Sequence, residues 1–168
     1  MTSRLTLGLV IAAALSDSFL AGLNINRALV EMPAWQQTGP LGWAAFSRHA
    51  DLALNAAILY PGAAFAGLLL SVAAIISFHR DRTAPRRAIV PLYAAAVLAA
   101  AGLLMTLKAA PYMLSVPSLD NDAAALQQAL DGFQFWGGIR GVFQVSAFVA
   151  NFWSLVALLM PSTGPEPR

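Results

Sequence analysis

Cysteine is absent from this 168-residue chain, and histidine occurs only as His49 and His79. The lack of cysteine excludes disulfides, thiolate catalysis, iron–sulfur clusters and thiolate zinc sites. The two histidines lie at opposite ends of one long apolar stretch, so a multi-histidine metal centre is not expected within one chain. We therefore expect neither a resident metal nor another cofactor.

Charge is also scarce. Charged residues make up 11% of the chain, against roughly 25% in soluble domains, whereas hydrophobic residues make up 58% and the mean hydropathy is +0.65. This composition predicts an all-α integral membrane protein. Four spans of roughly 20–25 residues use most of the length, so we expect a single four-helix bundle over residues 1–160 and a disordered cytoplasmic tail at 161–168.

The apolar runs predict where these spans lie. The first begins like a signal peptide, with Arg4 as its basic residue, but apolar character continues beyond Ser16 and favours a retained helix. Pro33 is expected to end that span. Short interfacial helices are expected in both outer loops. The expected spans are 5–30, 51–78, 88–110 and 139–160, and the expected interfacial helices are 41–50 and 120–131.

The segment 79–87 carries four arginines and predicts the orientation of the chain. Short loops rich in Lys and Arg stay in the cytoplasm, so this loop and both termini are expected there, in a multi-pass protein of the cell membrane. Binding of nucleic acid or lipid headgroups by these arginines is the less favoured alternative. The opposite loops carry the acidic residues Asp120, Asp122 and Asp131.

Every expected span carries polar side chains near its outer end. At 100° per residue, Asn24, Arg27 and Glu31 share one face of the first helix, and Asn26 points away from it. Such groups are expensive in a bilayer and are expected to face the bundle interior. The residues that this convergence predicts for one outer pocket are Asn24, Arg27, Glu31, Trp43, Arg48, His49, Asp51, Asn55, Tyr60, Lys108, Tyr112, Arg140 and Gln144.

Two explanations of this set stay open. In the structural one, Lys108 reaches water by its long side chain, and Arg27–Glu31 and Arg48–Asp51 form ion pairs. In the functional one, a pocket with more basic than acidic groups binds an anion such as an enolate, phenolate or carboxylate. Separately, mid-span Asp17 is expected to form a structural hydrogen bond with Asn24 or Asn151.

The segments AGLNINRALVEMPAW, GWAAFSRHADL and LYPGAAFAGLLL, together with four short spans, resemble the anthrone-oxygenase-like family of small membrane proteins. The resemblance implies oxygenation of an activated aromatic polyketide carbon to a quinone without metal or flavin. The expected partners are then the lipid bilayer, a hydrophobic aromatic small molecule and dioxygen, with no nucleic acid; a homo-oligomer is left open.

A mechanism fits this resemblance. Asp51 or His49 removes a proton next to a carbonyl, and the enolate, stabilised by Arg27, Arg140 and Lys108, reacts directly with dioxygen. Asp51, His49, Arg27 and Arg140 are therefore the expected catalytic residues, and the remaining pocket residues are expected to bind substrate. The alternative is a non-catalytic membrane protein, either a transporter component or an accessory subunit that binds a partner.

Overall fold

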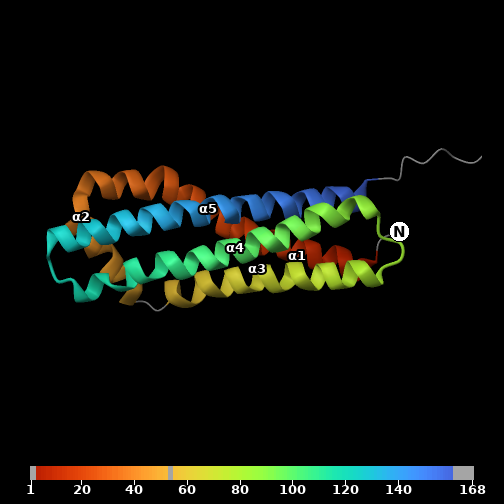
Figure 1. The fold of residues 1–168 in the computed structure, drawn as a ribbon, viewed down its shortest axis with the longest axis horizontal. Helices are drawn as coiled ribbons and strands as arrows, with labels where there is room; N and C mark the ends of the chain where they lie inside the picture. The colour runs from red at the N-terminus through yellow and green to blue at the C-terminus, as the bar shows by residue number, and fades with distance from the viewer. Residues whose placement is uncertain (1–2, 53–54, 161–168) are drawn as a thin grey trace, which may run out of the picture.

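The chain forms a bundle of long helices that lie side by side (Figure 1). The computed structural model describes residues 3–52 and 55–160, and the side chains at 51, 52 and 55–57 are outside this description, as is the predicted tail at 161–168. The α-helices are α1 (Arg4–Asn26), α2 (Met32–Leu52), α3 (Asn55–Arg80), α4 (Ile89–Leu114) and α5 (Ala123–Leu159). The short elements are the π-helix η1 (Arg27–Glu31) and the 3₁₀ turns η2 (Arg86–Ala88) and η3 (Val116–Ser118).

Four helical stretches in the described residues are long and apolar enough to cross a membrane. They are Arg4–Ala50, Ile58–Arg80, Arg86–Ser118 and Ala123–Leu159. The prediction of an all-α fold built on four long apolar helices is therefore confirmed.

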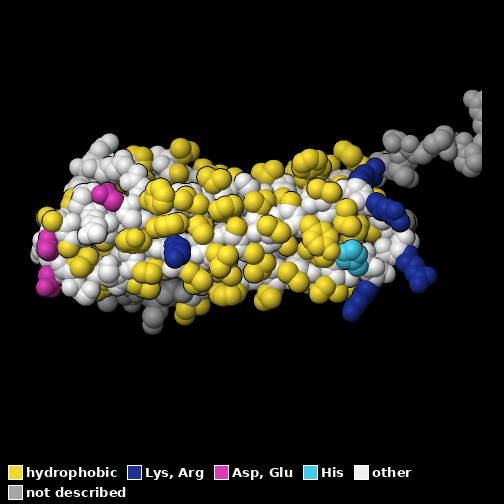
Figure 2. All heavy atoms as spheres, viewed as in Figure 1, with side chains coloured by type: hydrophobic (Ala, Val, Ile, Leu, Met, Phe, Trp, Pro, Cys, Tyr) yellow, Lys and Arg dark blue, Asp and Glu magenta, His cyan; other side chains and the backbone are white. Residues whose placement is uncertain are grey.

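The two ends of the bundle differ in charge. We call the end that holds Ser3, the α3–α4 connection and Met160 the terminal end, and the end that holds α2 and the α4–α5 connection the distal end (Figure 1). Figure 2 shows Lys and Arg gathered at the terminal end, Asp and Glu at the distal end, and hydrophobic side chains over the length between them. On this face the side of the bundle is mainly apolar, and most of the charged side chains lie at its ends.

Pro33 does not end the first helix, so that prediction was wrong. Proline has no N–H to donate to the carbonyl four residues earlier. The chain widens into η1 just before it, where the Met32 N–H donates to the Arg27 carbonyl five residues back. The helical direction instead breaks at Gly39, whose φ of 73° lies in the left-handed region that glycine tolerates, and Pro40 follows it. The second half of α2 then crosses the distal end (Figure 1).

Neither interfacial helix expected in the outer loops forms an element of its own in the described residues, although the break at Gly39 gives the stretch at 41–50 a separate direction. The Asp122 carboxylate caps α5 by accepting hydrogen bonds from the backbone N–H groups of Ala124 and Ala125, at 3.0 and 3.2 Å. From there α5 runs for 37 residues through Gly137 and Gly138 without a break. The expected helix at 120–131 is thus the start of α5, and the expected helix at 41–50 is part of α2.

Small residues and polar contacts hold the bundle together between its ends. A Cβ on Gly102 of α4 would lie 3.0 Å from the Gln144 Cγ of α5, so these helices approach closely where α4 carries a small residue. The Asn151 amide donates to the Asp17 carboxylate at 2.7 Å and to the Ser71 hydroxyl at 3.1 Å. This confirms Asn151 as a partner of Asp17 and joins α1, α3 and α5.

Candidate functional site

A cavity of about 180 Å³ lies between α1, α3, α4 and α5 toward the distal end of the bundle. Its walls are mainly apolar, with a few polar groups among them, which is the usual composition of a small-molecule site. The residues that line it are Leu20, Leu23, Asn24, Arg27, Tyr60, Pro61, Thr106, Ala110, Met113, Leu114, Phe133, Arg140 and Gln144.

Arg140 is the most unusual of these residues. Arg140 is only 9% exposed, and its Nε and Nη2 atoms have no hydrogen-bond partner among the described residues. No ion pair to Arg140 is present in this part of the chain either. A buried charge without a counter-ion is costly, so the protein keeps this guanidinium at the expense of stability.

Arg27 brings a second guanidinium to the cavity. Its Cζ lies 5.7 Å from the ring centroid of Tyr60 and 5.5 Å from that of Phe133, and the Arg140 Cζ lies 5.9 Å from the same Phe133 ring. These distances are within the range of cation–π attraction. Aromatic rings therefore hold both cations without neutralising their charge.

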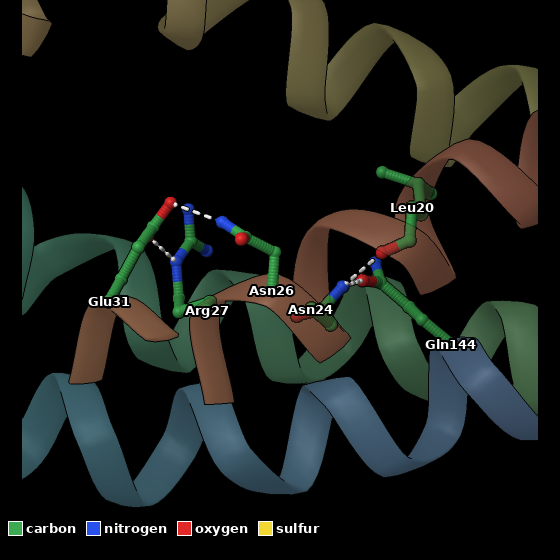
Figure 3. Close-up of polar contacts among 6 residues, drawn as sticks. All are labelled: Leu20, Asn24, Asn26, Arg27, Glu31 and Gln144. Carbon is green, nitrogen blue, oxygen red and sulfur yellow. Dashed lines mark hydrogen bonds and ion pairs between the residues drawn. The ribbon is translucent and has the colours of Figure 1, made fainter. Parts of the chain in front are cut away.

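Glu31 offsets part of the Arg27 charge. Its carboxylate lies 3.4 Å from the Arg27 Nε and accepts a hydrogen bond from the Asn26 amide at 2.9 Å (Figure 3). The expected Arg27–Glu31 ion pair is confirmed. Asn26 is exposed and does not line the cavity, as expected for a side chain off the Asn24–Arg27 face. Its contact with Glu31 was not expected and arises because the wider turn of η1 brings side chains five residues apart together.

Asn24 and Gln144 fix the two arginine-bearing helices against each other. The Asn24 amide donates to the Gln144 carbonyl at 2.5 Å and to the Leu20 backbone carbonyl at 2.7 Å (Figure 3). Gln144 follows Arg140 by one helical turn, so this contact fixes which part of α1 lies opposite Arg140. The bond thus positions the guanidinium within the cavity wall.

Five of the predicted site residues line this one cavity: Asn24, Arg27, Tyr60, Arg140 and Gln144. They come from α1, η1, α3 and α5, so the expected convergence of several helices at one level is present for this subset. Their role in binding or catalysis stays a prediction.

Other predicted site residues lie elsewhere. The exposed His49 ring has its Nδ1 2.6 Å from the Ala45 carbonyl, and His49 does not line the cavity. Arg48 donates to the Asp120 carbonyl and, at 3.1 Å, to the Asn121 side chain, so it ties α2 to the α4–α5 connection.

Three more predicted residues, Trp43, Tyr112 and Lys108, are not among the residues that line the cavity. Trp43 is fully buried in the distal core, with its ring centroid 6.0 Å from that of Phe133, and Tyr112 packs against the same core. Lys108 is exposed. The side chains of the predicted residues Asp51 and Asn55 lie outside the described residues.

Phe133 is the main lining residue that the sequence did not predict. It precedes Arg140 by seven residues and Gln144 by eleven, which places all three on one face of a continuous helix. This spacing was not recognised because residues 132–138 were expected to connect the helix at 120–131 with the span at 139–160. Thr106 and Met113 of α4 were missed because neither residue type stands out in an apolar helix.

The described lining residues support anion binding better than proton abstraction. They include two guanidinium groups, one phenol and two amides, but no carboxylate or imidazole. Within the described residues there is also no cluster of His, Asp or Glu that could hold a metal ion. Two guanidinium donors beside aromatic rings form a suitable surface for an aromatic anion.

Comparison with protein-family models, with curated proteins and with solved structures found no match.

Proposed function

We propose that this protein is a multi-pass membrane protein whose distal cavity binds an aromatic anion. The observation that carries the proposal is the buried, unpaired guanidinium of Arg140 in the wall of a mainly apolar cavity. The four long apolar helices support the membrane location, and the arginines at the terminal end favour a cytoplasmic position for both termini.

The ligand class follows from the donors and the walls. A carboxylate, phenolate or enolate oxygen can accept hydrogen bonds from the free Nε and Nη2 of Arg140, in the fork geometry that suits planar anions. Arg140 is buried among mainly apolar lining residues, and a low local dielectric strengthens this attraction. A cavity of about 150 Å³ holds benzene, so about 180 Å³ accommodates roughly one aromatic ring.

The reaction that we propose is oxygenation of a methylene carbon activated by a carbonyl, as the family resemblance implies. A base removes one C–H proton and leaves an enolate, whose charge Arg140 and Arg27 stabilise. The carbanion forms a C–O bond with dioxygen and becomes a hydroperoxide. Loss of the second C–H proton then cleaves the O–O bond, so that CH₂ and O₂ give C=O and H₂O.

The proton acceptor in this scheme is not His49, which bonds to the Ala45 carbonyl away from the cavity. Asp51 keeps the role that the sequence suggested for it. Tyr60 and Thr106 are the described lining residues with a side-chain hydroxyl, which can exchange a proton at its oxygen.

The second candidate function is binding without catalysis, as in an accessory subunit or a component of a transporter. The absence of a carboxylate and an imidazole from the described lining residues favours it. Both candidates share the anion site, so binding and turnover have to be measured separately.

Binding is tested with 4-fluorosalicylate and its uncharged amide, titrated by calorimetry into the protein in nanodiscs. A hydrogen bond to a charged group contributes about 1.5–3 kcal/mol, so Arg140→Gln is expected to weaken salicylate binding roughly 10–100-fold. Arg48→Gln is the matched control, since that guanidinium bonds outside the cavity, and it is expected to bind normally. Equal binding of the acid and the amide would contradict an anion site.

Turnover is tested by oxygen uptake with anthrone. The oxygenase proposal requires a rate above spontaneous oxidation that falls in Arg140→Gln but not in Arg48→Gln. Anion binding without faster oxygen uptake would instead support the non-catalytic function.

A further inference from the structure

A second hollow lies on the side of the bundle next to the cavity. It is a groove of about 510 Å³ between the end of α1, η1 and α5. Its floor includes Gly137, Gly138 and Gly141 of α5, and it shares Asn24 and Arg27 with the cavity. Ile25 and Val142, which are 47% and 67% exposed, line it as well, so it is open to the apolar surroundings of the bundle.

The glycines keep this groove open. A Cβ on Gly138 would have no neighbour within 4 Å, so a larger side chain there would project into free space. A Cβ on Gly137 would lie 3.7 Å from the Arg140 Nη2, one of the two unpaired buried nitrogens. The Arg140 guanidinium, the proposed anion-binding group of the cavity, therefore lies next to Gly137 in the floor of the groove.

Asn24 and Arg27 line both hollows. The Asn24 amide is bonded to Gln144 of α5, whereas the Arg27 guanidinium is bonded to Glu31 of its own element, so Arg27 is the one that can move. Its side chain is 17% exposed, its ion pair with Glu31 is 3.4 Å long, and it contacts the rings of Tyr60 and Phe133 without a hydrogen bond to either. It also begins the π-helix η1, an element often found at functional sites. A rotation of Arg27 about its side-chain bonds would join groove and cavity without unfolding a helix.

The depth of the groove suits a molecule dissolved in the bilayer. A hydrocarbon core of about 30 Å corresponds to roughly 20 helical residues. We count about 20 residues along each helix from the terminal end of the bundle. The count runs from Arg4 to Asn24 in α1, from Arg80 to Tyr60 in α3, and from Leu159 to Arg140 in α5. In the proposed orientation the site is therefore at the distal boundary of the hydrocarbon, where aromatic anions with an apolar ring and a charged group concentrate.

We propose that this groove is a lateral entrance through which an aromatic anion passes from the bilayer into the cavity, with Arg27 moving aside. This inference rests on the proposed anion site. It also explains how a cavity sized for about one ring serves a polycyclic ligand, because the remaining rings extend along the groove.

The test uses the absence of cysteine from the natural chain. Gly138→Cys places one thiol in the groove, and modification with N-cyclohexylmaleimide then plugs it in protein that is already folded. Gly8→Cys is the matched control: Gly8 is an exposed α1 glycine with open space at its Cβ position, and it lines neither hollow. Exchange of 4-fluorosalicylate with each protein in nanodiscs is followed by ¹⁹F NMR before and after modification.

Plugging at Gly138→Cys is expected to slow association and dissociation together by at least about tenfold, leaving Kd unchanged because single-ring salicylate stays within the cavity. Modified Gly8→Cys should exchange at the unmodified rate. Unchanged exchange after plugging would overturn the entrance while leaving the anion site intact. A weaker Kd at an unchanged association rate would also overturn it, making the groove part of the binding site. No salicylate binding to the natural chain would overturn both proposals.

Discussion

Replacement of Arg140 by methionine should make the ligand-free protein more stable. Methionine keeps most of the apolar stem and removes the charged group whose Nε and Nη2 are buried without partners. Each buried unsatisfied donor costs about 1–3 kcal/mol, and a charged one more. The loss on the other side is the attraction to Phe133, about 0.5–2 kcal/mol.

The balance predicts that the free energy of unfolding of Arg140→Met rises by about 1–4 kcal/mol, the range seen when buried charged groups are replaced by apolar ones. Steric trapping in bicelles measures this quantity. Arg48→Met is the control; it removes a guanidinium that is hydrogen-bonded to Asn121, so it should not gain stability. Bound ligand should narrow or reverse this difference in the free energy of unfolding. Salicylate at 100 times its Kd should stabilise the natural chain by about 2.7 kcal/mol and Arg140→Met by much less.

A loss of more than about 1 kcal/mol in ligand-free Arg140→Met would refute this reasoning. It would show that the guanidinium contributes to the folded state and is not kept for a ligand.

Two further predictions concern the contacts around the site and at the terminal end. Gln144→Leu should lower the free energy of unfolding by about 1–3 kcal/mol because it removes the acceptor of Asn24 across α1 and α5. In a double-mutant cycle with Asn24→Leu, steric trapping should give a coupling of about 0.5–3 kcal/mol; additive effects would contradict a direct bond. At the terminal end, the hydrogen bond from the Thr83 hydroxyl, followed by that from the Ser3 backbone N–H, lowers the pKa of Asp81 from 3.8 to about 2. A lowered pKa stabilises the fold above about pH 4, and this stabilisation is lost as the pH falls through about 2, so Asp81→Asn should reduce the fall in melting temperature over that interval. An unchanged fall in the variant would contradict the assignment.

The sequence predicted the long helices well because their signal is average hydropathy over many residues, which tolerates local exceptions. The sequence-based prediction was wrong where one residue decides whether a helix ends or continues. A proline such as Pro33 normally ends a helix because it has no N–H to donate. Here the π-helix η1 directly precedes it and the helix continues, and no sequence pattern marks that π-helix. The expected helix at 120–131 and the expected span at 139–160 were kept apart, whereas α5 runs through both as one helix that packs against α4 and α1.

The same limit applies to the site. Helical periodicity placed Asn24 and Arg27 on one face of α1, and the structure shows both at the cavity. It could not show that Arg48 bonds to the α4–α5 connection, because that contact depends on how Gly39 redirects α2. The His49 ring lies against the Ala45 carbonyl of its own helix, and residue spacing does not distinguish that contact from one across the bundle. The cavity that unites the arginines is a property of the packed bundle and has no signature within any one helix.

The most direct test of the anion site observes the Arg140 guanidinium itself. With ¹⁵N-labelled arginine, NMR in nanodiscs should show the Nε signal of Arg140, assigned by its loss in Arg140→Gln, shift on addition of 4-fluorosalicylate and remain in place on addition of the uncharged amide. An Arg140 signal that responds to neither compound, while Arg48 or the terminal arginines respond to the acid, would contradict the account.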